Sequence, residues 1–147
     1  MVNGEPHCPR FTAKRTMMER ITSMNGKKAQ NIRERAYRYA LRAIKLYQFL
    51  QAQRDATGWI LGKQYLRAAT SSGANIEEAQ ASESRADFVH KCGIAQKEAR
   101  ESLYWLRLIA DSHIVSNARL AALTKETEEL VAIITAIVIS TKSRKVA

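Results

Sequence analysis

Apolar residues recur at steps of three and four along most of this chain, which is the period of an α-helix with one buried face. The intervening loops span only about three to five residues, so consecutive helices have to run antiparallel. We therefore predict an all-α fold, an antiparallel up-down-up-down four-helix bundle over residues 31–143. The predicted helices cover about residues 31–53, 59–81, 85–111 and 117–142.

The stretch from Gly62 to Ala79 differs from the other helical segments because its middle consists of small residues. Ser and Gly lower helix propensity by about 0.5–1 kcal/mol each relative to Ala, so packing against neighbours has to compensate. We expect this segment to be the central helix of the bundle. Three roles remain open for Asn75: it caps a helix, it cross-links helices inside the bundle, or it faces a shared interface.

Helix boundaries are marked by local signals. Ser84 and Asp87 fit a capping box at the start of the third helix, and Ser116 is a plausible N-cap of the fourth. The stretch from Asp55 to Gly58 is interpreted as a break between the first two helices. Residues 1–30 are polar, basic and free of any period, so they form a separate N-terminal extension that we expect to be disordered. Three methionines within it leave the biological start open: Met17, Met18 and Met24.

The formal charge of +10 is concentrated near the start of the chain. Residues 1–45 hold eleven Lys and Arg against three acids, a net of +8, whereas residues 46–147 have a net of +2. This asymmetry favours nucleic acid or another anionic surface as a partner. Solubility alone is the competing explanation.

A basic stripe on the predicted first helix is the sharpest functional feature. Its four cations lie opposite the apolar face, and no acid lies within the stripe. Such a stripe offers phosphate contacts that are sensitive to salt and tolerant of sequence. The alternative is an ordinary solvated helix face. The residues of the stripe are Arg35, Arg38, Arg42 and Lys45.

The third predicted helix is apolar nearly all round towards its end. A helix of this kind needs burial on several sides, which a single four-helix bundle does not provide. Tyr and Trp are typical anchors of protein interfaces, so we predict self-association there. The predicted interface residues are Tyr104, Trp105 and Leu108.

No arrangement of catalytic or metal-binding residues is recognisable. His7 and Cys8 lack further ligands, and His90 and Cys92 point about 200° apart on a helix. The Glu-x-x-His pattern of carboxylate-bridged metal bundles is missing after Glu77 and Glu78, and no phosphate-binding glycine loop occurs. We therefore predict a protein that is not an enzyme and that needs no metal or cofactor.

The cellular setting follows from cysteines and hydropathy. Only two cysteines occur, and a disulfide between Cys8 and Cys92 is not expected, which fits a reducing compartment. The most apolar stretch, 130–139, is about half the length that spans a bilayer. No signal peptide is visible. We predict a cytoplasmic protein without a membrane partner.

Several segments resemble the four-helix bundle proteins associated with intervening sequences in 23S ribosomal RNA genes. They include QYLRAATSSGANIEEA at 64–79, Asp87 to Lys91, the Lys-Glu-Ala-Arg-Glu run at 97–101, and Tyr104 to Arg107. The resemblance covers about residues 31–142 and implies a ring-like homo-oligomer, a pentamer, without established enzymatic activity. A related bundle, the accessory protein of diversity-generating retroelements, partners a reverse transcriptase and binds nucleic acid. The chain departs from the common pattern at Ser72, where Ile is usual.

Two functions follow from these observations. The first is a non-catalytic oligomer that binds RNA or DNA through the basic stripe. The second is a structural or scaffold oligomer that binds a protein partner, such as a reverse transcriptase or a ribosomal component, with the stripe merely solvated.

Overall fold

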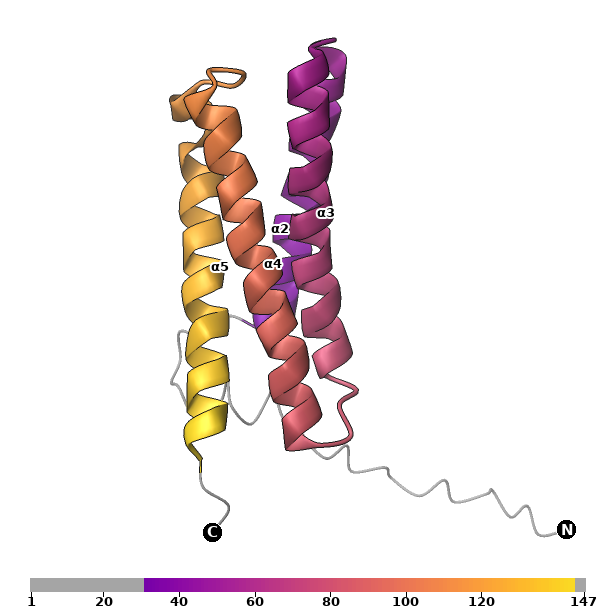
Figure 1. Ribbon diagram of the computed structural model, residues 1–147, viewed down its shortest axis with the longest axis vertical. Coiled ribbons are helices and arrows are strands. Elements are labelled where there is room, and N and C mark those ends of the chain that lie inside the picture. The colour runs from indigo at the N-terminus through magenta and orange to yellow at the C-terminus, as the bar shows by residue number, and fades with distance from the viewer. Residues whose placement is uncertain (1–30, 145–147) are drawn as a thin grey trace, which may run out of the picture.

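A computed structural model describes residues 31–144, and these form four α-helices without any strand. The helices lie side by side along one long axis (Figure 1). This confirms the predicted all-α class and the number of helices. The extension predicted over residues 1–30, with its histidine, cysteine and methionines, lies outside the described residues. The helices are α2 (Ile32–Ala52), α3 (Ala56–Ala79), α4 (Arg85–Asp111) and α5 (Asn117–Ser143).

The start of α3 corrects the prediction for the first break. The Asp55 carboxylate accepts a hydrogen bond from the Gly58 backbone N–H at 2.6 Å and caps the helix. The helix therefore begins at Ala56, three residues earlier than predicted. Ser84 is confirmed as the predicted N-cap of α4, because its hydroxyl accepts from the Asp87 N–H at 3.1 Å.

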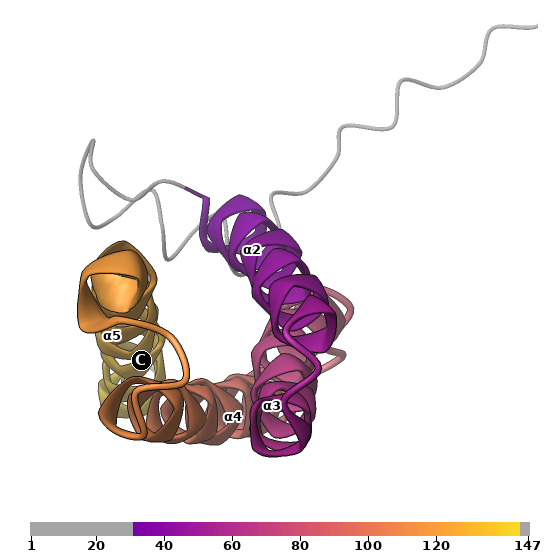
Figure 2. The ribbon, with the colours of Figure 1, turned by 90° about the horizontal axis from the view of Figure 1, so that it is seen from above.

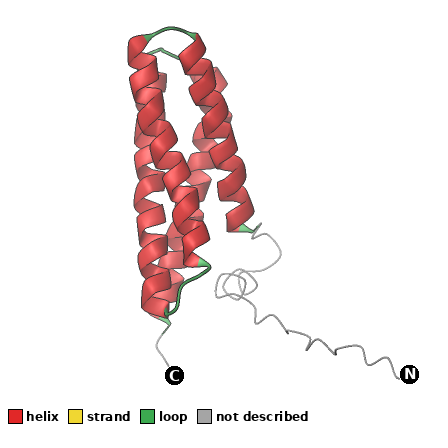
Figure 3. Cartoon of the chain, turned by 90° about the vertical axis from the view of Figure 1, so that its right-hand side faces the viewer, coloured by secondary structure: helices red, strands yellow, loops and turns green. Residues whose placement is uncertain are grey.

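The loops place each helix beside the next one in the sequence. Residues 53–55, 80–84 and 112–116 join the helices (Figure 3). Seen from above, α2, α3, α4 and α5 follow one another around the long axis (Figure 2). Consecutive helices pack closely, whereas α2 and α5 contact each other sparsely. The bundle therefore has one seam that differs from the other three.

Helix α3 packs against both α2 and α4, as expected of the small-residue segment. A Cβ at Gly62 would lie 2.7 Å from the buried Leu50 side chain, so the glycine permits this close approach. The Ser72 hydroxyl is buried and donates to the Ala95 carbonyl of α4 at 3.1 Å. Asn75 donates to the carbonyl one turn earlier in its own helix, so it does not cross-link helices through this bond.

A polar layer crosses the apolar core at mid-height. The Tyr39 hydroxyl lies within hydrogen-bond distance, 3.0 Å, of both the Thr127 hydroxyl of α5 and the Ser102 hydroxyl of α4. The Tyr65 ring meets the Tyr39 ring edge-on, with 6.4 Å between centroids. The Tyr65 hydroxyl is also buried, yet it finds no hydrogen-bond partner among residues 31–144. Two buried tyrosines side by side thus differ in hydrogen bonding.

We expect Tyr39→Phe to lower the free energy of unfolding by about 1 kcal/mol, because it removes a buried hydrogen-bonded hydroxyl. Ser102 and Thr127 keep their bonds to the Ala99 and Leu123 carbonyls, so neither becomes unsatisfied. Tyr65→Phe is the matched control and should be neutral or stabilising. Urea denaturation measures both. An equal loss in the two variants would contradict this account of the polar layer.

Candidate functional site

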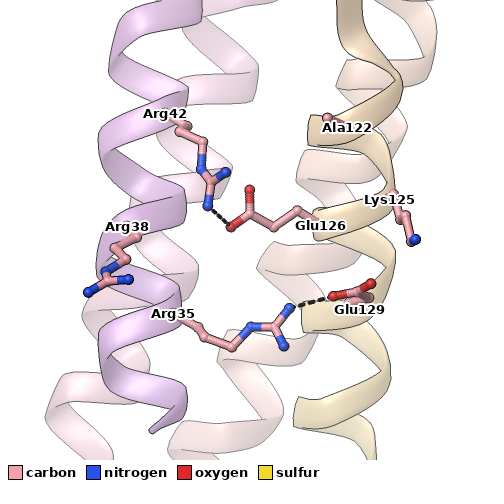
Figure 4. A pocket seen from close by; sticks show the side chains of 7 residues that line it. All are labelled: Arg35, Arg38, Arg42, Ala122, Lys125, Glu126 and Glu129. Carbon is pink, nitrogen blue, oxygen red and sulfur yellow. Dashed lines mark hydrogen bonds and ion pairs between the residues drawn. The ribbon is translucent and has the colours of Figure 1, made fainter. Parts of the chain in front are cut away.

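The sparsely packed seam between α2 and α5 contains the predicted basic residues. Three of the four, all arginines, line a cavity of about 370 Å³ there, whereas Lys45 lies outside it and is exposed. We call this cavity and its lining the α2–α5 seam (Figure 4). Its lining residues are Arg35, Arg38, Arg42, Ala122, Lys125, Glu126 and Glu129.

Carboxylates pair with the arginines of the seam, which the sequence did not indicate. Arg35 Nη2 lies 2.6 Å from Glu129 Oε2, and Arg42 Nη2 lies 2.6 Å from Glu126 Oε1. Both acids come from α5, so the stripe meets acids across the seam in addition to Glu34 on its own helix. No acid lies within the stripe itself, yet carboxylates beside it offset part of its positive charge.

The other two members of the stripe differ from these. Arg38 Nε lies 2.7 Å from Glu34 Oε1, one turn earlier on the same helix, and its side chain is 59% exposed. Lys45 is exposed and takes part in no ion pair within residues 31–144. Arg38 and Lys45 are thus the stripe residues most accessible to a partner from solvent.

The contacts across the seam form a ladder along the two helices. Arg35, Arg42 and Phe49 follow one another at seven-residue spacing on α2. The Arg119 guanidinium of α5 stacks on the Phe49 ring at 4.4 Å, which adds a cation–π contact above the two ion pairs. At these three positions along α2 and α5, charged side chains therefore make the contacts between the two helices.

The pKa values of the two carboxyl groups of the seam, Glu126 and Glu129, are shifted in opposite directions. The Glu126 side chain is only 12% exposed, and its Oε2 is buried without a partner in the described part of the chain. Burial raises the pKa of Glu126, although Arg42 and Arg35 act against this shift. The hydrogen bond from Arg35 lowers the pKa of Glu129. Negative charge is therefore disfavoured at Glu126 and favoured at Glu129.

The three predicted interface residues on α4 differ in how far they are exposed. Tyr104 is 56% exposed and meets the Trp105 ring edge-on at 5.0 Å. Trp105 instead packs against the core, and its indole N–H donates to Glu101 at 3.1 Å. Leu108 is half-buried. Tyr104 alone of the three offers a large exposed surface.

Sequence analysis missed another exposed apolar set, which lies on the outer face of α2. Tyr37 is 63% exposed, and Leu41 and Ile44 are also exposed. Their spacing of four and three residues was the available signal, because it matches one helix face. That face lies beside Arg38 and Lys45 rather than towards the core.

Nothing in the described residues gathers into a catalytic or metal centre. No three side chains of His, Cys, Asp or Glu within residues 31–144 lie close enough to hold a metal ion. Cys92 is buried in the core, and burial raises the pKa of its thiol to about 12. Over the same range, none of the helices has the length and apolar character needed to cross a bilayer.

The opposite pKa shifts in the seam give a prediction of opposite sign for two variants. A carboxyl with a raised pKa binds more protons in the folded state, so its contribution to stability falls as pH rises above 4.5. We expect Glu126→Gln to gain stability relative to wild type between about pH 4 and about pH 7. Glu129→Gln should lose stability relative to wild type as pH rises through the lowered folded pKa towards 4.5, with no further change at higher pH. Thermal unfolding measures both, and equal signs would contradict the assignment.

Comparison with known proteins gives a consistent picture. The family model described as 23S rRNA-intervening sequence protein matches residues 28–136. A solved structure from Bacteroides thetaiotaomicron VPI-5482, described as a protein with unknown function from the S23 ribosomal protein family, is 34% identical. The match covers 73% of this chain and 97% of that one, with a TM-score of 0.68. A search of curated proteins finds no match.

The match to the family model spans most of the chain and all four helices except the end of α5. The solved structure adds the same fold at an identity that supports common descent. The resemblance first noted in the segments around 64–79 and 97–107 is confirmed. This chain belongs to the 23S rRNA-intervening sequence protein family.

Proposed function

We propose that the protein is a non-catalytic, oligomeric four-helix bundle that binds nucleic acid, RNA or DNA, through the basic surface of α2. The observation that carries this proposal is the gathering of cations at one seam. Arg35, Arg38 and Arg42 of α2 meet Lys125 of α5 around one cavity, and Lys45 extends the basic surface along α2. Clustered Lys and Arg on one face are the electrostatic footprint of a phosphate-binding surface.

The ion pairs of the seam do not prevent this function. Each of the three arginines contacts its carboxylate through a single nitrogen in the described structure, so further guanidinium donors remain for a phosphate. The Arg38–Glu34 pair is exposed on both sides, and pairs of this kind contribute only about 0–1 kcal/mol. A phosphodiester chain that offers several oxygens can therefore compete for the same donors.

Removing the two most accessible charges tests the proposal. We expect Arg38→Gln with Lys45→Gln to weaken binding of a single-stranded oligoribonucleotide. The slope of log K against log salt should become less steep by about 1.4, because about 0.7 is lost per phosphate contact. Fluorescence anisotropy at several salt concentrations measures this slope.

Lys97→Gln with Arg100→Gln is the matched control for that variant. Both residues are exposed on α4, and the pair removes the same net charge away from the seam. An equal change of slope in the control would show general charge attraction and contradict a site on α2. No detectable binding by the wild-type protein would contradict the proposed function itself.

The proposal includes the assembly. We infer an antiparallel up-down-up-down bundle that forms a ring-like homo-oligomer, a pentamer, in the cytoplasm, with an interface around Tyr104, Trp105 and Leu108. The exposed Tyr104 ring, supported from behind by Trp105, favours this face of α4. Aromatic residues with exposed apolar area are typical interface anchors.

We expect Tyr104→Ala to lower the mass of the native assembly, because it removes the exposed aromatic anchor. Trp105 still packs against the core in this variant, so the bundle itself stays intact. Tyr37→Ala is the control, since this ring is similarly exposed but lies on α2. Light scattering at micromolar concentration measures the mass. A monomeric wild type, or an unchanged mass for Tyr104→Ala, would contradict the proposed interface.

The second candidate is a scaffold that binds a protein partner, such as a reverse transcriptase or a ribosomal component. The exposed face of Tyr37, Leu41 and Ile44 favours it, because apolar residues on one exposed helix face commonly mark protein contacts. Under this alternative, RNA binding would be missing or would not depend on salt, while Tyr37→Ala would impair capture of the partner.

A further inference from the structure

We propose that Glu126 and Glu129 are internal competitors for the guanidiniums of the α2–α5 seam, and that a nucleic-acid phosphate displaces them and is also bound by Lys125. This inference rests on the proposed function and assigns a regulation to the same site. The protein would thus carry its own mimic of a phosphate anion on the helix that faces the basic stripe.

The geometry of the two ion pairs is that of a phosphate contact. Each carboxylate oxygen lies 2.6 Å from a guanidinium nitrogen, slightly closer than the about 2.7–2.9 Å of a charge-assisted hydrogen bond. A phosphate oxygen would take the same place. In Figure 4, the Glu126 and Glu129 carboxylates extend from α5 towards Arg42 and Arg35 on α2. The carboxylates and a phosphate therefore compete for one set of donors.

The pairs of the seam have fewer contacts than two other arginine sites on the bundle. Arg33 contacts both oxygens of Glu77, through Nε and Nη2. Arg67 contacts two different carboxylates, Glu98 and Glu101. Arg35 and Arg42 each contact one carboxylate oxygen through one nitrogen. Because two-point contacts add both energy and geometric specificity, a phosphate displaces the carboxylates from Arg35 and Arg42 more easily than those from Arg33 and Arg67.

The environment of Glu126 also favours its displacement. Its inner oxygen has no hydrogen-bond partner in the described structure, so the carboxylate is held on one side only. Arg42 and Arg35 face it from α2, Glu129 lies on its own helix, and the neutral phenol groups of Tyr39 and Tyr65 lie behind it. Burial raises the pKa of Glu126, so the seam disfavours the negative charge that competes with a phosphate for Arg42.

Lys125 completes the site from the α5 side. It lies next to Glu126 in sequence, is exposed, and lines the seam cavity. It also lines a neighbouring cavity between α4 and α5 together with Arg107. It forms no ion pair within residues 31–144. In Figure 4 its ammonium group points away from Arg35 and Arg42, so it is open, without any exchange, to a neighbouring phosphate of the same strand.

The decisive experiment compares two neutralising variants with the same net charge. Glu126→Gln with Glu129→Gln removes the competitors, and Glu83→Gln with Glu128→Gln removes two exposed acids outside the seam. Each protein is titrated with a fluorescent single-stranded oligoribonucleotide and with a DNA strand of the same sequence. We expect the seam variant to bind about fivefold more tightly than the control variant, as expected for loss of a competing surface ion pair.

Each result has a definite meaning. Tighter binding by the seam variant to both strands supports exchange, because the phosphodiester is common to RNA and DNA. Unchanged or weaker binding, or a gain with RNA alone, overturns the competitor role and leaves the proposed function standing if the wild type binds. A failure of every variant to bind overturns both proposals. Binding by the seam variant alone, without binding by the wild type, overturns the proposed function and with it the inference that rests on it.

A second variant tests the role of Lys125 separately. We expect Lys125→Gln to weaken binding in the wild-type background and in the seam variant, with Lys97→Gln on α4 as the control. Circular dichroism and thermal unfolding verify that each variant stays folded. Equal effects of Lys125→Gln and Lys97→Gln would remove Lys125 from the site.

Discussion

The Tyr39 hydroxyl is the point at which three helices of the bundle are tied together. A buried hydroxyl without a hydrogen bond costs about 1–3 kcal/mol, so the position of this group is constrained by its partners. Its partners are Ser102 on α4 and Thr127 on α5. Short loops already hold every other neighbouring pair of helices together. The pairing of α2 with α5 has no such connection, and the polar layer supplies a specific contact there.

This constraint explains why the seam is charged. With a polar layer at its centre, the α2–α5 contact cannot be a continuous apolar stripe. The positions above and outside this layer are occupied by the Arg35–Glu129 and Arg42–Glu126 pairs and by Arg119 stacked on Phe49. In each of these ion pairs the guanidinium contacts its carboxylate through a single nitrogen, so further donors of the arginine stay open to an anion. The part of the bundle that is least stabilised by apolar burial is therefore also the part best suited to receive an anion.

Much of the fold could be predicted from the sequence because helix periodicity reports which face of a segment is buried. The N-cap at Ser84 was equally predictable, because its signal lies within four consecutive residues. The start of α3 was misplaced, since Asp55 was interpreted as part of a break and acts as a cap. The site was predictable only in part. The period of one helix identifies Arg35 and Arg42 as a stripe, and it carries no information about acids that another helix places opposite them.

The predicted interface shows the same limit. Trp105 and Leu108 were assigned to an interface because α4 is apolar nearly all round near its end, yet Trp105 packs against the core of its own bundle. Whether an apolar side chain faces the core or a partner depends on the angle between neighbouring helices, which the sequence of one helix does not contain. The exposed set of Tyr37, Leu41 and Ile44 was overlooked although its spacing of four and three residues on α2 could have revealed it.

The central claim is that the arginines of the α2–α5 seam exchange carboxylate for phosphate. Nuclear magnetic resonance of the arginine Nε–H groups, during titration with a single-stranded oligoribonucleotide, observes this exchange directly. The account predicts that the signals of Arg35, Arg38 and Arg42 shift, while that of Arg67, which is held by two carboxylates away from the seam, stays in place. Shifts at Arg67 with unmoved signals from the seam would contradict it.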